Sequence, residues 1–342
     1  MTDQSIFNNT HLIEAYSNFG NLLQDYGMLT DAIANYEKAY ELAINMFAIS
    51  DFFPDKYKSL DDIANYYRKT LEHFITLMKY ELYTASLDKK RINLEQIAKC
   101  EKANQKTILI VVSAFNREKI TRLSLAQTKR YKETYCHLQV YNDHSTEYDN
   151  SFLESLADEV IMLPEKMGIH DLRCYQLRNF LETDFDFMYM TDNDIIHDPQ
   201  YIKVLETLYN IGDCKLPVCL YNSPYHSDDK TVLYNERGIM IKKTAPGVSM
   251  FFDRKMVEKI VNALNKIGND HAMYGWDYVA IAYLGLPWIS PEISFLEHYG
   301  GGGLHNIDFE IDRAINPTQY LKDRRNDIIK YLTEDVNLQI LF

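Results

Sequence analysis

The N-terminal third of the chain carries a helical pattern of hydrophobic positions. Apolar side chains recur at three-to-four-residue spacing, as the buried face of an amphipathic helix requires; these are Leu12, Ile13, Tyr16, Phe19, Leu22 and Leu23. Tyr26-Gly27 then interrupts the pattern, and Thr30-Asp31 is a typical N-cap before a second helix. We therefore expect an all-α region over residues 1–103.

Small residues stand where two such helices would cross. Gly20 and Ala32 would allow a close approach, and Tyr36 would fill the space beside them. This arrangement resembles the tetratricopeptide helix pair. The string DAIANY at 31–36 returns as DDIANY at 61–66, an offset of 30, whereas the usual period is about 34. A degenerate tetratricopeptide-like region and a plain helical bundle are both consistent with the pattern.

Near Gln105 the pattern changes to short apolar runs that alternate with helical stretches. The runs at 107–115, 137–143, 158–164 and 186–194 predict strands, and helices are expected at 117–133, 151–157 and 169–182. This order predicts a parallel sheet with right-handed crossovers. Ligands of such sheets bind outside the carboxyl ends of the strands. The polar clusters 113–117, 142–145 and 192–194 fall at those ends.

Composition and charge narrow the class of protein. The chain has 342 residues, of which 46% are hydrophobic and 25% charged, enough for a real core. A net charge of −13 disfavours nonspecific binding to nucleic acid. The five cysteines have no CxxC spacing, which fits a reducing compartment. We see no signal peptide and no apolar run of about 18 residues, so we expect a cytoplasmic protein without a transmembrane segment.

The first candidate site is the acidic string Asp192-Asn193-Asp194. It ends a predicted buried strand. Two carboxylates two positions apart can share one hard cation with a ribose or a diphosphate. Solvated turns often carry the same string, but its position at the end of a strand favours a binding role.

Several segments, taken in order, resemble the motifs of GT-A glycosyltransferases. They are VVSAFNR (111–117), YNDHSTEYD (141–149), LRN (177–179), TDND (191–194), PGVSMFF (246–252) and YGWDYVAIAYLGLP (274–287), followed by His305. The stretch 106–306 is similar to the family 2 group and its galactosyltransferase and N-acetylgalactosaminyltransferase relatives. The resemblance implies an α/β fold class with a GT-A (nucleotide-diphospho-sugar transferase, Rossmann-like) domain at 104–315. An N-terminal all-α helical domain (1–103) would precede it, and a C-terminal helical tail (316–342) would follow.

The resemblance also implies a donor site. The cofactors would be Mn²⁺ or Mg²⁺ and a nucleotide diphosphate sugar, with a UDP-sugar as the first expectation. The implied donor contacts are Ser113, Ala114, Phe115, Arg117, Asp143, Ser145, Gly168, Arg173, Arg178, Asp192 and Asn193. Within this set Asp143 would accept from the base, and Arg173 competes with Arg178 for a phosphate.

The metal ligands implied by the resemblance are Asp194 and His305, with Asp192 on the ribose or reaching the metal through water. His298 is the alternative to His305. Four glycines (300–303) precede His305 and would let the backbone approach a ligand closely or form a mobile lid.

On the acceptor side, Asp277 is the candidate general base, which would give one displacement with inversion. The same aspartate also fits an N-cap, because GWD precedes a helical pattern. Trp276 offers a flat face to a sugar ring and is equally consistent with a core position. Gly247 and Val248 would lie near the acceptor, which could be a glycan, a lipid-linked sugar or a protein side chain.

Two other classes of function compete with a metal-dependent, inverting transferase. A nucleotidyltransferase normally carries a Gly-rich loop after the first strand, and this chain has Ser113-Ala114-Phe115 there. A sugar-nucleotide-binding module without activity would not need the Asp192, Asp194, Asp277 and His305 set. The N-terminal helices could bind a protein partner, support self-association or act as a buttress.

Overall fold

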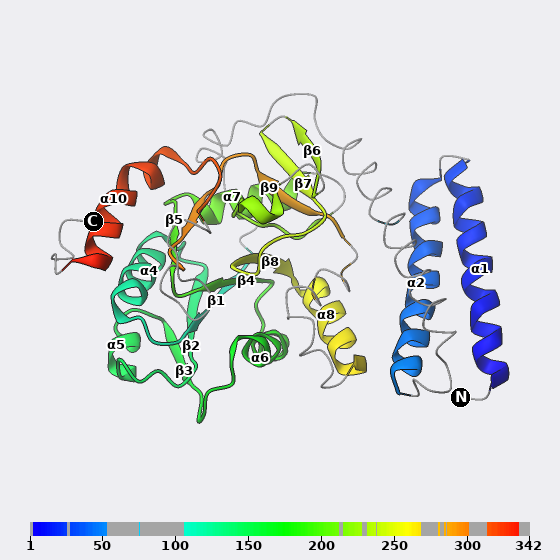
Figure 1. Cartoon of the computed structure of the whole chain (residues 1–342), viewed down its shortest axis with the longest axis horizontal. Helices are drawn as coiled ribbons and strands as arrows, with labels where there is room; N and C mark the ends of the chain where they lie inside the picture. Colours follow the sequence, from blue (N-terminus) through cyan, green and yellow to red (C-terminus); the bar gives the residue numbers. More distant parts are fainter. Residues whose placement is uncertain are drawn as a thin grey trace.

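The computed structural model describes residues 3–25, 28–52, 75, 106–211, 215–227, 231–236, 238–267, 280, 284, 286–300 and 313–334. A helical hairpin lies at one end, and an α/β body forms the rest of the described chain (Figure 1). Among the described helices, none is both long and apolar enough to cross a bilayer.

The hairpin consists of α1 (Asp3–Asp25) and α2 (Leu29–Phe52). A Cβ added at Gly20 would lie 2.8 Å from the Tyr36 ring, so the missing side chain allows the close approach of the two helices. The Tyr36 hydroxyl donates to the side chain of Asn21, which satisfies it against α1. The two helices predicted here are present, whereas the second copy of the string at 61–66 lies outside the described residues.

The α/β body alternates strands and helices in the predicted order. Its strands are β1 (Ile108–Ala114), β2 (Cys136–Asn142), β3 (Glu159–Met162), β4 (Phe187–Asp192), β5 (Ile195–His197), β6 (Val232–Glu236), β7 (Ile239–Lys242), β8 (Ser249–Asp253), β9 (Trp288–Pro291) and β10 (Leu296–His298). Its helices are α4 (Glu118–Tyr131), α5 (Asn150–Glu154), α6 (Ile169–Leu181), α7 (Tyr201–Asn210), the 3₁₀ turn η2 (Pro224–His226), α8 (Arg254–Ile267) and α10 (Gln319–Thr333).

The central sheet has the strand order β3-β2-β1-β4-β8. The first four strands pair in parallel, which confirms the predicted α/β class. β8 pairs antiparallel with β4, a feature that the sequence pattern did not predict. β6, β7 and β9 form a second, antiparallel sheet, and Val218 bridges both β8 and β9.

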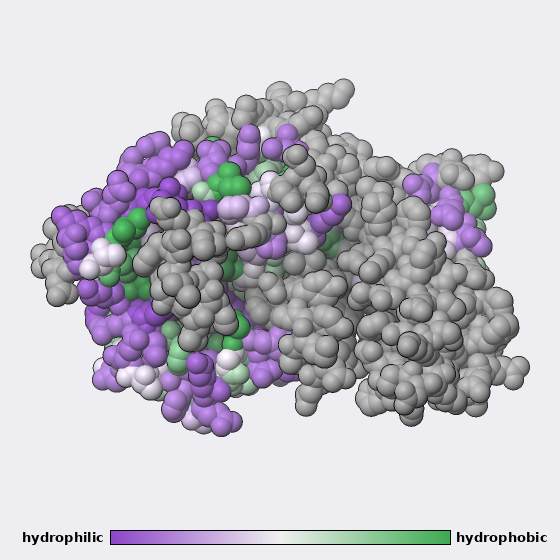
Figure 2. Space-filling model, viewed as in Figure 1, coloured by the Kyte–Doolittle hydropathy of each residue, from purple (hydrophilic) through white to green (hydrophobic). Residues whose placement is uncertain are grey.

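Apolar side chains explain why these strands are central. Every residue of β1 is buried, and β4 is buried up to Asp192, as continuous apolar runs in a covered parallel sheet require. Hydrophilic residues cover most of the visible face over α4, α5 and α10, with small hydrophobic patches between them (Figure 2). The three described cysteines, Cys136, Cys174 and Cys219, are buried free thiols.

The C-terminal helix α10 belongs to the α/β body. Leu321, Ile328 and Tyr331 of α10 form a second hydrophobic cluster with Ile120 and Leu123 of α4. Thr318 caps α10 by accepting from Leu321 N at 3.4 Å. The predicted tail is therefore packed against the body as far as residue 334, and the apolar end of the chain lies outside the described residues.

Candidate active site

The polar clusters that follow β1, β2 and β4 meet at one edge of the central sheet. β1 lies between β2 and β4, so the chain turns to opposite sides of β1 and leaves a crevice at the carboxyl ends of β1 and β4. Ser113 of β1 lies opposite Asp192 of β4. A cavity of about 630 Å³ opens at this edge.

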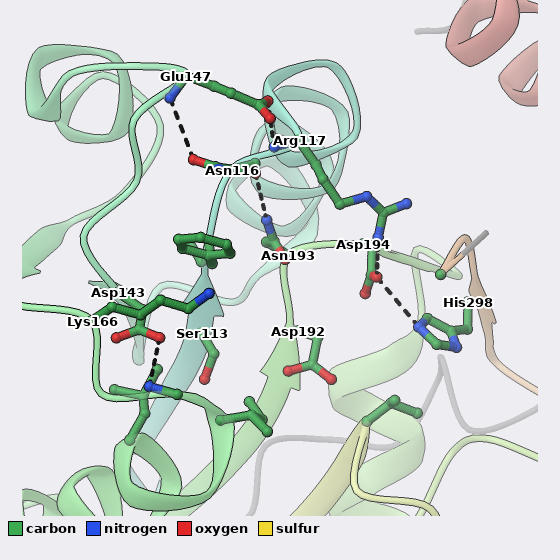
Figure 3. Close-up of a pocket in the computed structure, with 17 residues that line it drawn as sticks. Ser113, Asn116, Arg117, Asp143, Glu147, Lys166, Asp192, Asn193, Asp194 and His298 are labelled. Carbon is green, nitrogen blue, oxygen red and sulfur yellow. Dashed lines mark hydrogen bonds and ion pairs between the residues drawn. The ribbon is translucent and has the colours of Figure 1, made fainter. Parts of the chain in front are cut away.

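Seventeen residues line this cavity (Figure 3). They are Ser113, Ala114, Phe115, Asn116, Arg117, Asp143, Glu147, Lys166, Gly168, Ile169, Leu172, Asp192, Asn193, Asp194, Val248, His298 and Gly300. They come from the ends of β1, β2 and β4 and the loops that follow them, from the start of α6, from the residue before β8 and from the end of β10 and the segment after it.

Asp194 lies between two basic side chains. Its Oδ2 accepts from Arg117 at 2.6 Å and lies 3.4 Å from His298 Nε2, and both side chains point at it in Figure 3. Burial raises the pKa of Asp194, but His298 and Arg117 outweigh burial and hold the pKa at about 2. Its Oδ1 is buried with no hydrogen-bond partner among the described residues.

β10 fixes the position of His298. It pairs antiparallel with β5, directly after Asp194, and places His298 opposite Ile195. Tyr299 N donates to the Asp194 carbonyl at 2.9 Å. A Cβ at Gly300 would lie 2.6 Å from the His298 ring, so glycine allows the backbone to pass against the imidazole.

Asp192 forms an ion pair with Arg173 of α6, which does not line the cavity. The Arg173 side chain has no exposed surface and donates to the Asp192 carboxylate and, at 2.8 Å, to the Thr191 carbonyl. Arg173 also donates to Gln176 at 3.1 Å, and Gln176 donates to Ser113 Oγ at 3.0 Å. Burial raises the pKa of Asp192 and the neighbouring Asp194 adds to this, whereas Arg173 opposes it.

The turn after β1 has an unusual backbone. Asn116 and Arg117 have φ angles of 51° and 63°, a left-handed conformation that costs a non-glycine residue about 1–3 kcal/mol. Glu147 stabilises the turn, because its Oε2 accepts from Arg117 N at 2.6 Å and from Glu118 N at 3.1 Å. Asn193 Nδ2 donates to the Asn116 carbonyl at 3.2 Å. The turn after β1 is thereby tied to the acidic string after β4.

The opposite side of the cavity is built around Asp143. Its two carboxylate oxygens accept from Met167 N at 2.6 Å and from Gly168 N at 3.0 Å. Gly168 has φ 82°, which favours glycine, and it precedes α6. Lys166 Nζ lies 3.8 Å from the centre of the Phe115 ring, a cation–π contact beside Asp143.

The cavity carries carboxylates and cations side by side. Among the described residues, no group of three or more His, Cys, Asp or Glu side chains is arranged to hold a metal ion. A nucleotide-bound Mg²⁺ typically uses only one or two protein carboxylates, with phosphates and water as the remaining ligands. The partnerless Asp194 Oδ1 and the nearby Asp192 fit that smaller donor set, with the His298 imidazole close to it.

The structure brings most of the sequence-predicted residues to this cavity. Those that line it are Ser113, Ala114, Phe115, Arg117, Asp143, Gly168, Asp192, Asn193, Asp194 and Val248. Gly247, next to Val248, is half-buried. Ser145 lies behind the lining and accepts from Asn116 N at 2.9 Å.

Two predicted arginines differ from the expectation, and three further predicted residues lie outside the described part of the chain. Arg173 was expected at a phosphate, and the structure instead buries it as the partner of Asp192. Arg178 is exposed on α6 and does not line the cavity. Trp276, Asp277 and His305 lie outside the described residues.

The sequence did not predict some residues of the cavity and predicted another only as an alternative. Lys166 and Glu147 lie in loops whose course is set by tertiary packing, although each stands within a few positions of a predicted contact. His298 was placed second to His305. The glycine two positions after His298 was a sequence sign of close packing at that imidazole.

No family model matches the sequence, and no curated protein matches it. Among solved structures, a mannosyltransferase from Pyrobaculum calidifontis in complex with GDP-mannose and Mn²⁺ is similar, with 14% identity and a TM-score of 0.41. The match covers 62% of this chain and 64% of that chain, less than two thirds of either. The function is therefore inferred from the cavity residues themselves.

Proposed function

We propose that this chain is a metal-dependent glycosyltransferase of the GT-A type. It would move a sugar from a nucleotide diphosphate sugar to an acceptor hydroxyl. The observation that carries this proposal is the cavity at the ends of β1 and β4. There, Asp192 and Asp194 lie beside Arg117 and His298. A diphosphate with its cation needs such a mixture of charges, because the cation binds carboxylates and the phosphate oxygens bind basic groups.

The acidic side of the cavity would receive the diphosphate. Bound Mn²⁺ or Mg²⁺ neutralises the charge that develops on a diphosphate leaving group. Asp194 would hold the cation directly, with Asp192 nearby and either His298 or His305 as a further ligand. Arg117 lines the same space with a side chain that is 23% exposed, and it would donate to phosphate oxygens.

The Asp143 side would receive the nucleoside. Phe115 supplies a flat ring, and Lys166 lies over that ring. Each Asp143 oxygen already accepts one backbone N–H, and each keeps a further lone pair for a donor group on a base. A UDP-sugar is our first candidate, because the uracil N3–H can donate to a carboxylate.

The chemical step would use a general base on the acceptor side. We propose Asp277 for this role, with Trp276 and the Gly247-Val248 segment near the acceptor. A positioned carboxylate that removes the acceptor proton accelerates such a step by roughly 10²–10⁴-fold. Replacement of Asp277 by alanine should abolish transfer and leave donor binding largely intact. A fully active Asp277→Ala enzyme would reject the base assignment.

The N-terminal hairpin would serve recognition rather than chemistry. The contact of Gly20 with Tyr36 brings α1 and α2 close together, which supports a helical-repeat role, and helical-repeat modules bind other proteins. We propose that this region recruits a protein partner or an acceptor, or supports self-association.

A panel of nucleotide sugars tests the proposal. The protein is incubated with UDP-, GDP-, CDP-, ADP- and dTDP-sugars, in Mn²⁺ and in EDTA, and the released nucleoside diphosphate is measured. Slow Mn²⁺-dependent hydrolysis of one donor is the expected result. Release of pyrophosphate from a nucleoside triphosphate and a sugar phosphate would instead indicate a nucleotidyltransferase. Tight binding without turnover on any acceptor would indicate a binding module.

A further inference from the structure

Arg117 places a positive charge on the carboxylate that would hold a cation. Its guanidinium donates to Asp194 Oδ2 at 2.6 Å and to the Tyr299 carbonyl at 2.6 Å. The same Oδ2 lies 3.4 Å from His298. A divalent cation on either oxygen of this carboxylate would sit within a few ångströms of the arginine, and two like charges at that distance repel strongly in a partly buried site.

The backbone beneath Arg117 is fixed although the side chain is not enclosed. Glu147 binds the amide of Arg117, and Ser145 binds the amide of Asn116. The turn keeps its left-handed conformation through these contacts, so the Cα of Arg117 is held at the edge of the cavity. The side chain itself is 23% exposed and borders the space that a diphosphate would fill.

Arg173 provides an internal contrast. It also pairs with an aspartate of the acidic string, but its side chain is fully enclosed by α6 and β4. It has no route to a ligand in the cavity and acts as a permanent partner of Asp192. Of the two arginine–aspartate pairs, the pair of Arg117 and Asp194 is therefore the one that can exchange partners.

We propose that Arg117 is an exchangeable counter-ion that couples cation binding to diphosphate binding, an inference that rests on the proposed function. Without donor it neutralises Asp194 and keeps the affinity for a divalent cation low. When a diphosphate enters, its oxygens accept from the guanidinium, whose planar set of donors suits phosphate, and the Asp194 carboxylate is left free to bind the cation. By linkage the cation raises the affinity for the diphosphate by the same factor.

Titrations of Mn²⁺ and of nucleoside diphosphates test this coupling. Mn²⁺ binding is measured by electron paramagnetic resonance on the full chain, first alone and then with saturating UDP, GDP, CDP, ADP or dTDP. The variants are Arg117→Ala and Arg117→Lys, and the matched control is Arg122→Ala. Arg122 is a half-exposed arginine of α4, the helix that follows Arg117, and it does not line the cavity. Circular dichroism checks that each variant is folded. If Arg117→Ala does not fold, the comparison is made with Arg117→Lys, which keeps the positive charge but loses the planar set of donors.

Opposite changes in the two affinities are expected. For Arg117→Ala, Mn²⁺ alone should bind about fivefold tighter or more, the diphosphate with Mn²⁺ should bind about fivefold weaker or more, and the coupling factor should shrink. Arg117→Lys should lie between Arg117→Ala and the wild type, and Arg122→Ala should match the wild type. An unchanged or weaker Mn²⁺ affinity in Arg117→Ala would overturn the inference.

The two proposals fail in different ways. If the wild type binds no nucleoside diphosphate in any condition, the proposed function fails. The Mn²⁺-alone measurement would then still show whether Arg117 competes for Asp194. If the wild type binds both ligands and Arg117→Ala changes neither affinity, only the coupling role of Arg117 is rejected.

Discussion

The two sides of the cavity hold their carboxylates by different means. Asp194 has the side chains of Arg117 and His298 as its partners. Asp143, across the cavity, accepts from the backbone amides of Met167 and Gly168. Side-chain partners can move when a ligand arrives, whereas backbone amides at the start of a packed helix cannot.

This difference indicates that the two carboxylates have different roles in binding. A carboxylate with movable partners can take a new cation, because its present partners can find other acceptors. A carboxylate fixed by amides keeps its place and orients whatever binds beside it. We therefore propose that Asp194 exchanges its side-chain partners for a cation and that Asp143 orients the ligand bound beside it.

The largest expected effect is that of Asp194→Asn. The amide keeps the shape but loses the negative charge that would hold a cation, so Mn²⁺-dependent turnover should fall about 100-fold or more. The measurement is the rate of nucleoside diphosphate release under saturating Mn²⁺. Asp171→Asn, an exposed position on α6, is the matched control. If Asp194→Asn kept most of the activity, Asp194 would not be the carboxylate that binds the cation, and the proposed difference between the two sides would be rejected.

Asp143→Asn should have a smaller effect on rate and a larger effect on stability. One amide-to-carboxylate hydrogen bond is lost or weakened, and hydrogen bonds to charged groups are worth about 1.5–3 kcal/mol. We expect a lower free energy of unfolding in urea and weaker nucleotide binding, with turnover at saturation close to normal. The exposed Asp184→Asn serves as control. A loss of turnover at saturation without a loss of stability would contradict a positioning role.

The strands and helices around the cavity could be predicted because their patterns are strong. β1 and β4 are continuous apolar runs, and polar residues begin where each strand ends. The meeting of Ser113 with Asp192 follows from the parallel pairing of β1 with β4. This part of the site depends only on strand order and on the position at which each strand ends.

The other parts of the site depend on contacts between distant segments. Arg173 was expected at a phosphate, and its burial follows from the packing of α6 on β4, which no spacing rule gives. His298 approaches Asp194 because β10 pairs with β5, two three-residue strands too short for a clear pattern. Lys166 reaches the cavity from a loop whose course is set by the bonds of Asp143.

Lys166→Met tests whether the cation–π contact on the Asp143 side of the cavity contributes to nucleotide binding. The cation–π contact with Phe115 is worth about 0.5–1 kcal/mol at a partly exposed site, so the affinity for nucleotide should fall about two- to fivefold. Calorimetric titration measures this change. Lys106→Met is a matched control, because Lys106 lies over the Phe187 ring away from the cavity. Equal effects of the two substitutions would show that the contact at Phe115 has no role in binding.

The smallest expected effect is on the free energy of unfolding, through a histidine in β5, the strand that follows Asp194. His197 of β5 is fully buried beside Tyr189, Tyr201 and Thr128, and burial lowers its pKa to about 3. The unfolded chain binds a proton near pH 6.5 and the folded chain does not, so stability is complete above that pH and falls on acidification. Between pH 7.5 and pH 6 the expected loss is about 0.8 kcal/mol.

Urea unfolding of the wild type and of His197→Phe at both pH values measures this contribution. The phenyl ring cannot be protonated, so the variant should lose less stability than the wild type over the same interval. An identical pH dependence in the two proteins would mean that His197 is protonated in the folded state or does not control this region.

The most direct test of the account is the binding of nucleoside diphosphates to the full chain, measured by calorimetry with Mn²⁺ and with EDTA. We expect that one nucleoside diphosphate binds in Mn²⁺ and that its affinity falls about tenfold or more in EDTA, since the cation would link Asp194 to the phosphates. Equal affinity in Mn²⁺ and EDTA, or no binding of any nucleoside diphosphate, would contradict it.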